Sequence, residues 1–159
     1  MKNIILSIGL LFATALSTAQ NVFQASGERS VLRTELPKYT KIDIDSRWEV
    51  TLVNEKNGHI YIDADNAIHP IIKATVEDGT LKISLETPKG VNFVQTGGIK
   101  LKIPIKGTSE LKMQSGKIRS EEPINMPSYK MLLDFLSEID LKLNVNDLDL
   151  EIGSCKEGN

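Results

Sequence analysis

The chain has 159 residues with 19 basic and 21 acidic side chains, and its formal net charge of −2 argues against nucleic-acid binding, which requires a clearly basic surface. A single cysteine excludes an intramolecular disulfide framework. Stability must therefore come from a hydrophobic core, and a chain of this length is long enough to bury one as a single domain.

Residues 1–19 have the pattern of a secretory signal peptide. Lys2 supplies positive charge, an apolar run covers 4–16, and Ser17 and Ala19 are the small residues that a signal peptidase reads. The run is roughly 13 residues long, whereas spanning a bilayer takes about 20. We therefore expect an exported protein that does not span a membrane after cleavage.

The exported form should begin at Gln20, directly after the small-residue site. Mass spectrometry of the protein recovered from its native host measures this N-terminus. An intact Met1 in the envelope fraction would contradict export.

The first elements of the mature chain are a lead and two strands. Residues 20–29 are polar and small, which predicts a flexible lead. Between 41 and 52 apolar side chains alternate with charged ones, interrupted only by Ser46, and this period of two predicts a half-buried strand. Asn57-Gly58 is suited to a turn with positive φ, and 60–64 continue the alternation on a return strand.

The middle of the chain contains at most one short helix, near 66–73, where Pro70 limits it to about one turn. Asp78-Gly79 lies between two alternating runs and predicts a tight hairpin with a two-residue type I′ turn. Loops follow at 87–90 and 95–98, and alternation resumes from 99 to 105. The residues expected on the buried face of these strands are Trp48, Val50, Leu52, Leu81, Ile83, Leu101 and Ile103.

A weak internal repeat occupies the C-terminal third. Its copies are 111–116, 133–139 and 148–154, each a short alternating strand followed by small residues. Repeats of about 20 residues with one strand each are typical of a solenoid. An antiparallel meander also has regularly spaced strands, so the residues alone predict an all-β fold and leave these two architectures open.

The run from Tyr39 to Leu111 resembles the family called putative auto-transporter adhesin, head GIN domain. The segments that carry the resemblance are YTKIDI from Tyr39, WEVTL from Trp48, YIDAD from Tyr61, HPII from His69, VEDGTLKI from Val76 and the strand 99–105. The small-residue turns after Leu111 resemble the later rungs of that family. Glu138 and Cys155 stand where a glycine is usual in the family, and the chain stops where relatives usually continue.

The resemblance implies one domain over 30–159, shortened at its C-terminus, with the fold of a right-handed, single-stranded β-helix or β-solenoid. It also implies an exported or cell-envelope protein of Gram-negative bacteria, located in the periplasm, on the outer-membrane surface or outside the cell. The family defines no catalytic residues, so none are assigned to this chain, and no cofactor is expected.

Residues suited to enzymatic or metal chemistry are few. The histidines His59 and His69 lie beside turns and are expected to be surface residues rather than catalytic bases. Two scattered histidines and one cysteine do not make a zinc site. Paired carboxylates can bind calcium or cleave glycosides, but the candidates are expected to lie on solvated faces. These carboxylates are Asp63, Asp65, Asp140, Asp147 and Asp149.

Four lysines on the polar faces of the strands are the candidate ligand-binding residues. In a solenoid, Lys82, Lys100, Lys102 and Lys112 would stack into a basic stripe that attracts an anionic surface glycan. The first hypothesis is therefore a non-enzymatic, adhesin-like binding or scaffold module, with a surface glycan or an envelope protein as partner. The alternatives are a small polysaccharide-acting β-helix enzyme and a purely structural envelope protein.

The last strand, 148–152, is expected to be an open rung through which two copies pair as a homodimer. Cys155 follows it closely, and an odd cysteine in an exported protein is a candidate for an intermolecular disulfide.

Overall fold

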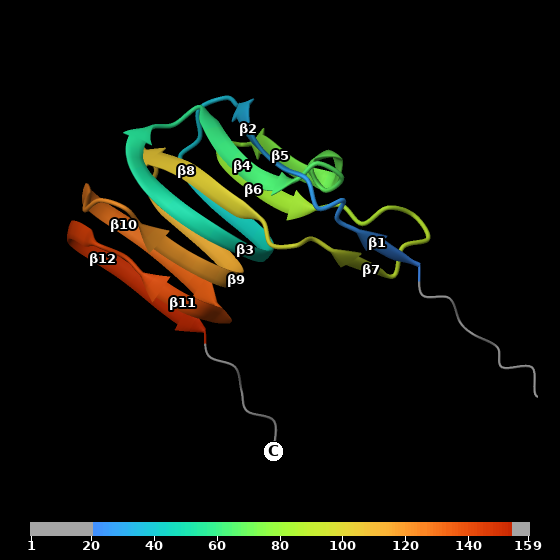
Figure 1. The fold of residues 1–159 in the computed structure, drawn as a ribbon. Helices are drawn as coiled ribbons and strands as arrows, with labels where there is room; N and C mark the ends of the chain where they lie inside the picture. The colour runs from blue at the N-terminus through green and yellow to red at the C-terminus, as the bar shows by residue number, and fades with distance from the viewer. Residues whose placement is uncertain (1–20, 154–159) are drawn as a thin grey trace, which may run out of the picture.

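The computed structural model describes residues 21–153, and all regular structure in them is β-strand except one 3-10 turn (Figure 1). The elements are β1 (Val22–Gln24), β2 (Arg29–Glu35), β3 (Lys41–Lys56), β4 (His59–Asp65), the turn η1 (His69–Ile71), β5 (Ile72–Glu77), β6 (Thr80–Leu85), β7 (Phe93–Gln95), β8 (Lys100–Lys106), β9 (Glu110–Ser120), β10 (Ile124–Asp134), β11 (Leu136–Asp140) and β12 (Leu143–Gly153). The predicted all-β class is confirmed. None of the described residues forms a helix long and apolar enough to cross a bilayer.

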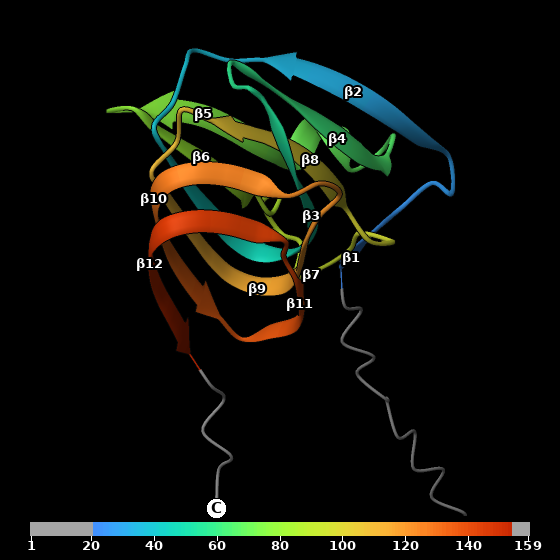
Figure 2. The same cartoon turned by 90° about the vertical axis from the view of Figure 1, so that its left-hand side faces the viewer.

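One ten-stranded sheet contains most of these strands, in the order β12-β10-β9-β3-β8-β4-β2, with β5, β6 and β11 paired beside this path. The pairs β3/β9, β9/β10 and β10/β12 are parallel, and Figure 2 shows β9, β10 and β12 stacked as curved ribbons. The pairs β2/β4, β4/β8 and β5/β6 are antiparallel. The sheets are not closed, so the topology does not confirm the predicted β-helix.

Strand β3 turns a corner at Ser46, the polar residue that interrupts its apolar alternation. Ser46 has a φ of 82°, and the pairing of β3 with β9 shifts register between Ile44 and Arg47. Before the corner β3 pairs with β6, and after it β3 pairs with β8. The apolar residues before and after Ser46 are buried alike, because the bend leaves them on the same, inward side.

The predicted return strand β4 follows its turn, in which Gly58 has a φ of 118°, but it does not pair with β3. Strand β8 lies between them. Leu101 of β8 is the parallel partner of Val50 in β3 and the antiparallel partner of Ile62 in β4. A turn signal reports only the local backbone conformation, so the sequence did not indicate that a third strand enters between the two.

The N-terminal lead and the loop before β8 contain strands that the sequence analysis did not predict. Strand β1 lies within 20–29 and pairs in parallel with β7, which follows the loop 87–90. The short helix expected near 66–73 is the single 3-10 turn η1, with Pro70 in its first positions.

The internal repeat is present in a different register. Leu111 pairs with Met131, which pairs with Leu150, so the second and third copies are each displaced by two residues from the predicted alignment. Among the small residues of the repeats, Gly116 has a φ of 115° within β9, and Gly153 ends β12. Burial of apolar side chains selects the register of β9 with β10, since Leu111, Met131 and Leu133 are fully buried in it.

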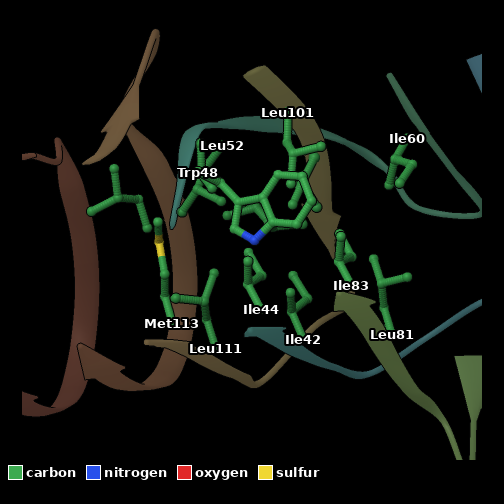
Figure 3. Packing of buried hydrophobic residues seen from close by; sticks show 14 of the residues in the cluster. Ile42, Ile44, Trp48, Leu52, Ile60, Leu81, Ile83, Leu101, Leu111 and Met113 are labelled. Atoms are coloured by element: carbon green, nitrogen blue, oxygen red, sulfur yellow. The ribbon is translucent and has the colours of Figure 1, made fainter. Parts of the chain in front are cut away.

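The core lies between the curved strands, and Trp48 is at its centre (Figure 3). Trp48 is 2% exposed, and its indole N–H donates a hydrogen bond to the carbonyl of Asp45. All seven residues predicted from alternation are buried, namely Trp48, Val50, Leu52, Leu81, Ile83, Leu101 and Ile103. The predicted inward faces of β3, β6 and β8 are therefore confirmed.

The Asp78-Gly79 hairpin is also confirmed. Glu77 and Thr80 are partners across the β5/β6 ladder, and the two residues between them have φ of 48° and 73°. Positive φ at both central positions is the requirement of a type I′ turn. The carbonyl of Gly79 also accepts hydrogen bonds from the backbone N–H groups of Thr40 and Lys41, which attaches the turn to β3.

Gly79→Val should lower the free energy of unfolding by about 1–2 kcal/mol, because a β-branched residue is strained at positive φ. Gly79→Asn is the matched control, since asparagine tolerates this conformation. Urea denaturation of both variants measures the difference. A valine variant as stable as the asparagine variant would contradict the turn geometry.

Candidate functional site

A groove of about 500 Å³ lies on the outer face of the sheet, where strands β2, β4, β8, β3 and β9 run side by side. Residues on this face alternate with the buried core residues, so the same period-two pattern that builds the core also places polar side chains here. The groove is lined by Val31, Glu49, Val50, Thr51, Glu55, Tyr61, Asp63, Lys100, Leu101, Lys102, Lys117, Ile118, Arg119, Glu121 and Glu138.

One row of side chains crosses the groove with alternating charge. The register of the strands places them in the order Asp63, Lys100, Glu49, Lys117, Glu138. Lys117 and Glu138 form an ion pair of 2.9 Å, and the hydrogen bond and negative charge of Glu138 raise the pKa of Lys117. Opposite charges on neighbouring strands attract, so this row stabilises the sheet as well as lining the groove.

A second row carries more positive charge and the aromatic ring of the groove. Its order is Tyr61, Lys102, Thr51, Arg119. The Arg119 Nε donates a hydrogen bond of 3.0 Å to the Thr51 hydroxyl, and Lys102 lies 3.3 Å from a carboxylate oxygen of Glu121. Together with Glu121, this row therefore offers guanidinium, ammonium, carboxylate and phenol groups at one surface.

The predicted lysine stripe is divided between two parts of the sheet. Lys100 and Lys102 lie in the groove. Lys82 and Lys112 instead flank Asp43 before the corner of β3, and Lys82 forms an ion pair of 2.7 Å with Glu77. That carboxylate raises the pKa of Lys82.

Several groove residues were not predicted as site residues from the sequence, among them Lys117, Arg119 and Tyr61. Lys117 and Arg119 flank the buried Ile118, so the alternation that identified the other strands also identifies them. The sequence did not show that these residues line one groove, because that depends on which strands pair over long distances along the chain.

Ser30 and His69 form an unexpected serine–histidine contact. The His69 Nε2 lies 3.2 Å from the Ser30 hydroxyl, but it also lies 3.0 Å from the Ser30 carbonyl. In the tautomer that carries its proton on Nε2, this nitrogen donates to that carbonyl and is no base toward the hydroxyl. The hydroxyl donates instead to the Asn66 side-chain oxygen at 2.6 Å. This arrangement fastens β2 to the turn after β4.

His59 is partly buried and packs edge-on against the Tyr61 ring, with a centroid distance of 5.3 Å. The predicted carboxylates are dispersed. Asp63 lines the groove and pairs with Arg29 at 3.0 Å, whereas Asp140, Asp147 and Asp149 are exposed on β11 and β12. In residues 21–153, no three His, Cys, Asp or Glu side chains are grouped so that they could hold a metal ion.

Asp65 is the one buried carboxylate of the described chain, and it joins β4 to the N-terminal segment. Its oxygens accept hydrogen bonds of 2.7–2.9 Å from the backbone N–H groups of Ser26, Gly27 and Ala67 and from the Ser26 hydroxyl. Burial alone raises the pKa of Asp65, but these hydrogen bonds outweigh it and lower the pKa to about 2.

Asp65→Asn should destabilise the protein, because the amide nitrogen replaces an acceptor and opposes one of these backbone N–H donors. The folded pKa lies below the ordinary value of 3.8. The contribution of Asp65 is therefore fully present above pH 3.8 and is lost as the pH falls through about 2. The stability difference between wild type and variant, measured by denaturation at several pH values, should shrink over this interval. Asp147→Asn, at an exposed carboxylate, should show no such change.

A second hollow, of about 530 Å³, lies beside β7 at the corner of β3 and β9. Apolar side chains from separate strands line part of it, including Leu85, Phe93 and Val94. Phe93 is 61% exposed, so its ring is accessible beside the hollow. The predicted signal peptide 1–19 and the candidate disulfide residue Cys155 lie outside the described residues.

Solved structures with a similar fold come from Bacteroides and Parabacteroides species. A putative adhesin from Bacteroides fragilis matches with a TM-score of 0.68 and 17% identity, over 82% of this chain and 62% of its own. A putative lipid binding protein from Parabacteroides distasonis matches with a TM-score of 0.66 and 18% identity, over 78% of this chain and 53% of its own. A putative adhesin from Parabacteroides merdae matches with a TM-score of 0.59 and 18% identity, over 80% and 60%.

This chain thus spans about half to two thirds of the length of those proteins, and at such identities the likeness concerns the fold. The comparison with curated proteins found no match. A family model, in contrast, matches residues 38–155, which include β3 to β12. The chain therefore belongs to the family described as putative auto-transporter adhesin, head GIN domain.

Proposed function

We propose that the protein is an exported, adhesin-like binding module that holds a glycan in the groove formed by β2, β4, β8, β3 and β9. The observation that carries this proposal is the groove itself, in which cationic side chains, carboxylates and the Tyr61 ring line one surface. Sugar hydroxyl groups both donate and accept hydrogen bonds, so they suit a surface where ammonium, guanidinium and carboxylate groups alternate.

The composition of the groove favours a different ligand from the anionic glycan that the lysine stripe alone would attract. It contains four cationic side chains, Lys100, Lys102, Lys117 and Arg119, and five carboxylates, Glu49, Glu55, Asp63, Glu121 and Glu138. These charges nearly balance, so a neutral glycan suits the groove better than a highly anionic one. The family description and the adhesins among the solved relatives support a surface role, and residues 30–159 would act as one domain.

A glycan array probed with residues 20–159 tests this proposal. Arg119→Ala should remove binding, whereas Lys112→Ala should keep it, because Lys112 lies outside the groove lining. Absence of any glycan binding by the wild type would contradict the proposal and favour the purely structural envelope protein. Shortening of the bound glycan during the assay would favour the polysaccharide-acting enzyme.

A second candidate ligand is a lipid chain in the hollow beside β7. Its support is the exposed Phe93 and the fold shared with a putative lipid binding protein. A fluorescent fatty acid titrated into the protein tests this lipid site. The variant Phe93→Ser changes the hollow beside β7 and leaves the lining of the glycan groove unchanged. Equal fluorescence with both proteins would contradict a lipid site there.

The parallel stack β3, β9, β10 and β12 also supports a solenoid architecture for the complete family fold. The register repeats from Leu111 to Met131 to Leu150, as successive rungs do. We therefore retain the right-handed β-helix as a proposal, to be decided by an experimental structure of the protein.

A further inference from the structure

Strand β12 is an edge of the main sheet. It pairs in parallel with β10 along most of its length, from Leu143 to Gly153, and no other strand in residues 21–153 pairs with it. Its backbone N–H and C=O groups that point away from β10 therefore have no ladder partner within that part of the chain. A long, regular edge of this kind is a template for another strand.

The inward side chains of β12 are apolar but remain exposed. Leu148, Leu150 and Ile152 have 40%, 45% and 56% of their surface accessible. Their register partners in β10 are Tyr129, Met131 and Leu133, all of which are buried. The apolar core side chains of β10 therefore have apolar neighbours in β12, but no further strand in residues 21–153 covers those neighbours. One more strand beside β12 would bury them.

The outward side chains of β12 are acidic. Asp147, Asp149 and Glu151 follow one another at every second position, and all three are exposed. Asp149 forms an ion pair of 3.4 Å with Lys130, but the partners of the other two in β10 are Ser128 and Leu132. Asp147 and Glu151 have no ion pair with any residue in 21–153.

Charges alternate across the strands that precede this edge. Lys41 pairs with Glu110 at 3.4 Å, Lys130 is the next residue in the same row, and Asp149 follows it. Opposite charges directly across a ladder are favourable and like charges are not. A strand added beside β12 would therefore continue this order only if it carried cations.

We propose that the edge of β12 binds an extended segment of a partner protein in which apolar residues alternate with lysine or arginine. The segment adds a strand to the sheet, its apolar side chains cover Leu148, Leu150 and Ile152, and its cations lie beside Asp149 and Glu151. Strand addition of this kind takes its affinity from main-chain hydrogen bonds and its specificity from alternate side chains.

The three acidic side chains of β12, Asp147, Asp149 and Glu151, also distinguish this partner from a second copy of the chain. In a two-fold dimer of β12 edges, the arrangement predicted from the sequence, the carboxylates of one strand would face those of the other. That contact is repulsive, whereas a cationic segment removes the repulsion.

Peptide binding to the full mature chain tests the proposal. The probes are two short peptides, one alternating valine with lysine and one alternating valine with glutamate. Affinity is measured by fluorescence anisotropy, and hydrogen exchange shows whether β12 becomes protected. The lysine peptide should bind and slow exchange in β12, and the glutamate peptide should not.

Three variants locate the site. Combined Asp149→Lys and Glu151→Lys should weaken binding of the lysine peptide about tenfold, because two attractive pairs become repulsive. Combined Glu28→Lys and Glu86→Lys makes the same change of net charge at exposed sites on other segments and should leave β12-dependent binding intact. Leu150→Lys places a charge on the inward face and should abolish strand addition.

Several results would overturn the proposal. These are no binding of the lysine peptide, equal binding of the glutamate peptide, and unchanged affinity in the double variant at Asp149 and Glu151. Sedimentation of the protein alone provides a further test, because self-association removed by the β12 variants would identify a second copy as the occupant. Circular dichroism verifies folding, and the exposed charge variants decide the question even if Leu150→Lys does not fold.

Discussion

Trp48→Ala should lower the free energy of unfolding by roughly 3–5 kcal/mol, the range for removing a large aromatic side chain from a packed core. Trp48 is almost fully buried at the centre of the cluster that joins β3 to its neighbouring strands (Figure 3). The indole N–H also donates to the Asp45 carbonyl beside the corner at Ser46. Alanine therefore leaves a cavity and an acceptor with one partner fewer.

Two further variants separate these contributions. Trp48→Phe keeps most of the apolar volume but removes the N–H donor, so it should lose less stability than alanine. Val31→Ala changes a side chain that is 63% exposed and should alter the free energy of unfolding by less than about 0.5 kcal/mol. Chemical denaturation measures all three. A loss for Trp48→Ala no larger than that for Val31→Ala would mean that the buried face of β3 is wrongly assigned.

Gly116→Ala should cost about 3 kcal/mol or more, because the new methyl group would overlap the backbone of β3. Gly116 has a φ of 115° and is the register partner of Trp48. A Cβ atom there would lie 2.0 Å from the Trp48 carbonyl oxygen and 2.7 Å from the Trp48 backbone nitrogen. These are backbone atoms, so β3 and β9 would have to separate at the corner.

Gly90→Ala is the matched control for this prediction. Gly90 also has positive φ, 79°, but a Cβ atom there would have no neighbour within 4 Å. Its free energy of unfolding should therefore fall by only about 1–2 kcal/mol, the cost of placing a non-glycine residue at positive φ, which both variants share. Equal losses of thermal stability in the two variants would show that the close approach of β9 to β3 is not the cause.

The candidate groove was predicted only in part. The lysines of the proposed stripe were found because they alternate with apolar residues, and Lys100 and Lys102 do share a surface. Lys82 and Lys112 belong to another part of the sheet, because β3 bends between the segments with which these lysines align. A bend caused by one residue at positive φ changes which polar faces meet, and its consequences are not local.

The sequence by itself determined the properties that depend on near neighbours along the chain. Alternation identified which face of β3, β6 and β8 is buried, since side chains in a strand point to opposite sides at every residue. Asp78-Gly79 identified a hairpin, since the turn requires positive φ at two adjacent positions.

Only the tertiary structure decided which strands meet. Alternating apolar strands are interchangeable as partners, so the pattern could not show that β8 lies between β3 and β4, or that Leu111 pairs with Met131 rather than with Leu133. The contact of Ser30 with His69 and the assembly of the groove follow from the same pairings. Burial selects the face of each strand locally, but register and neighbour are selected by packing over the whole sheet.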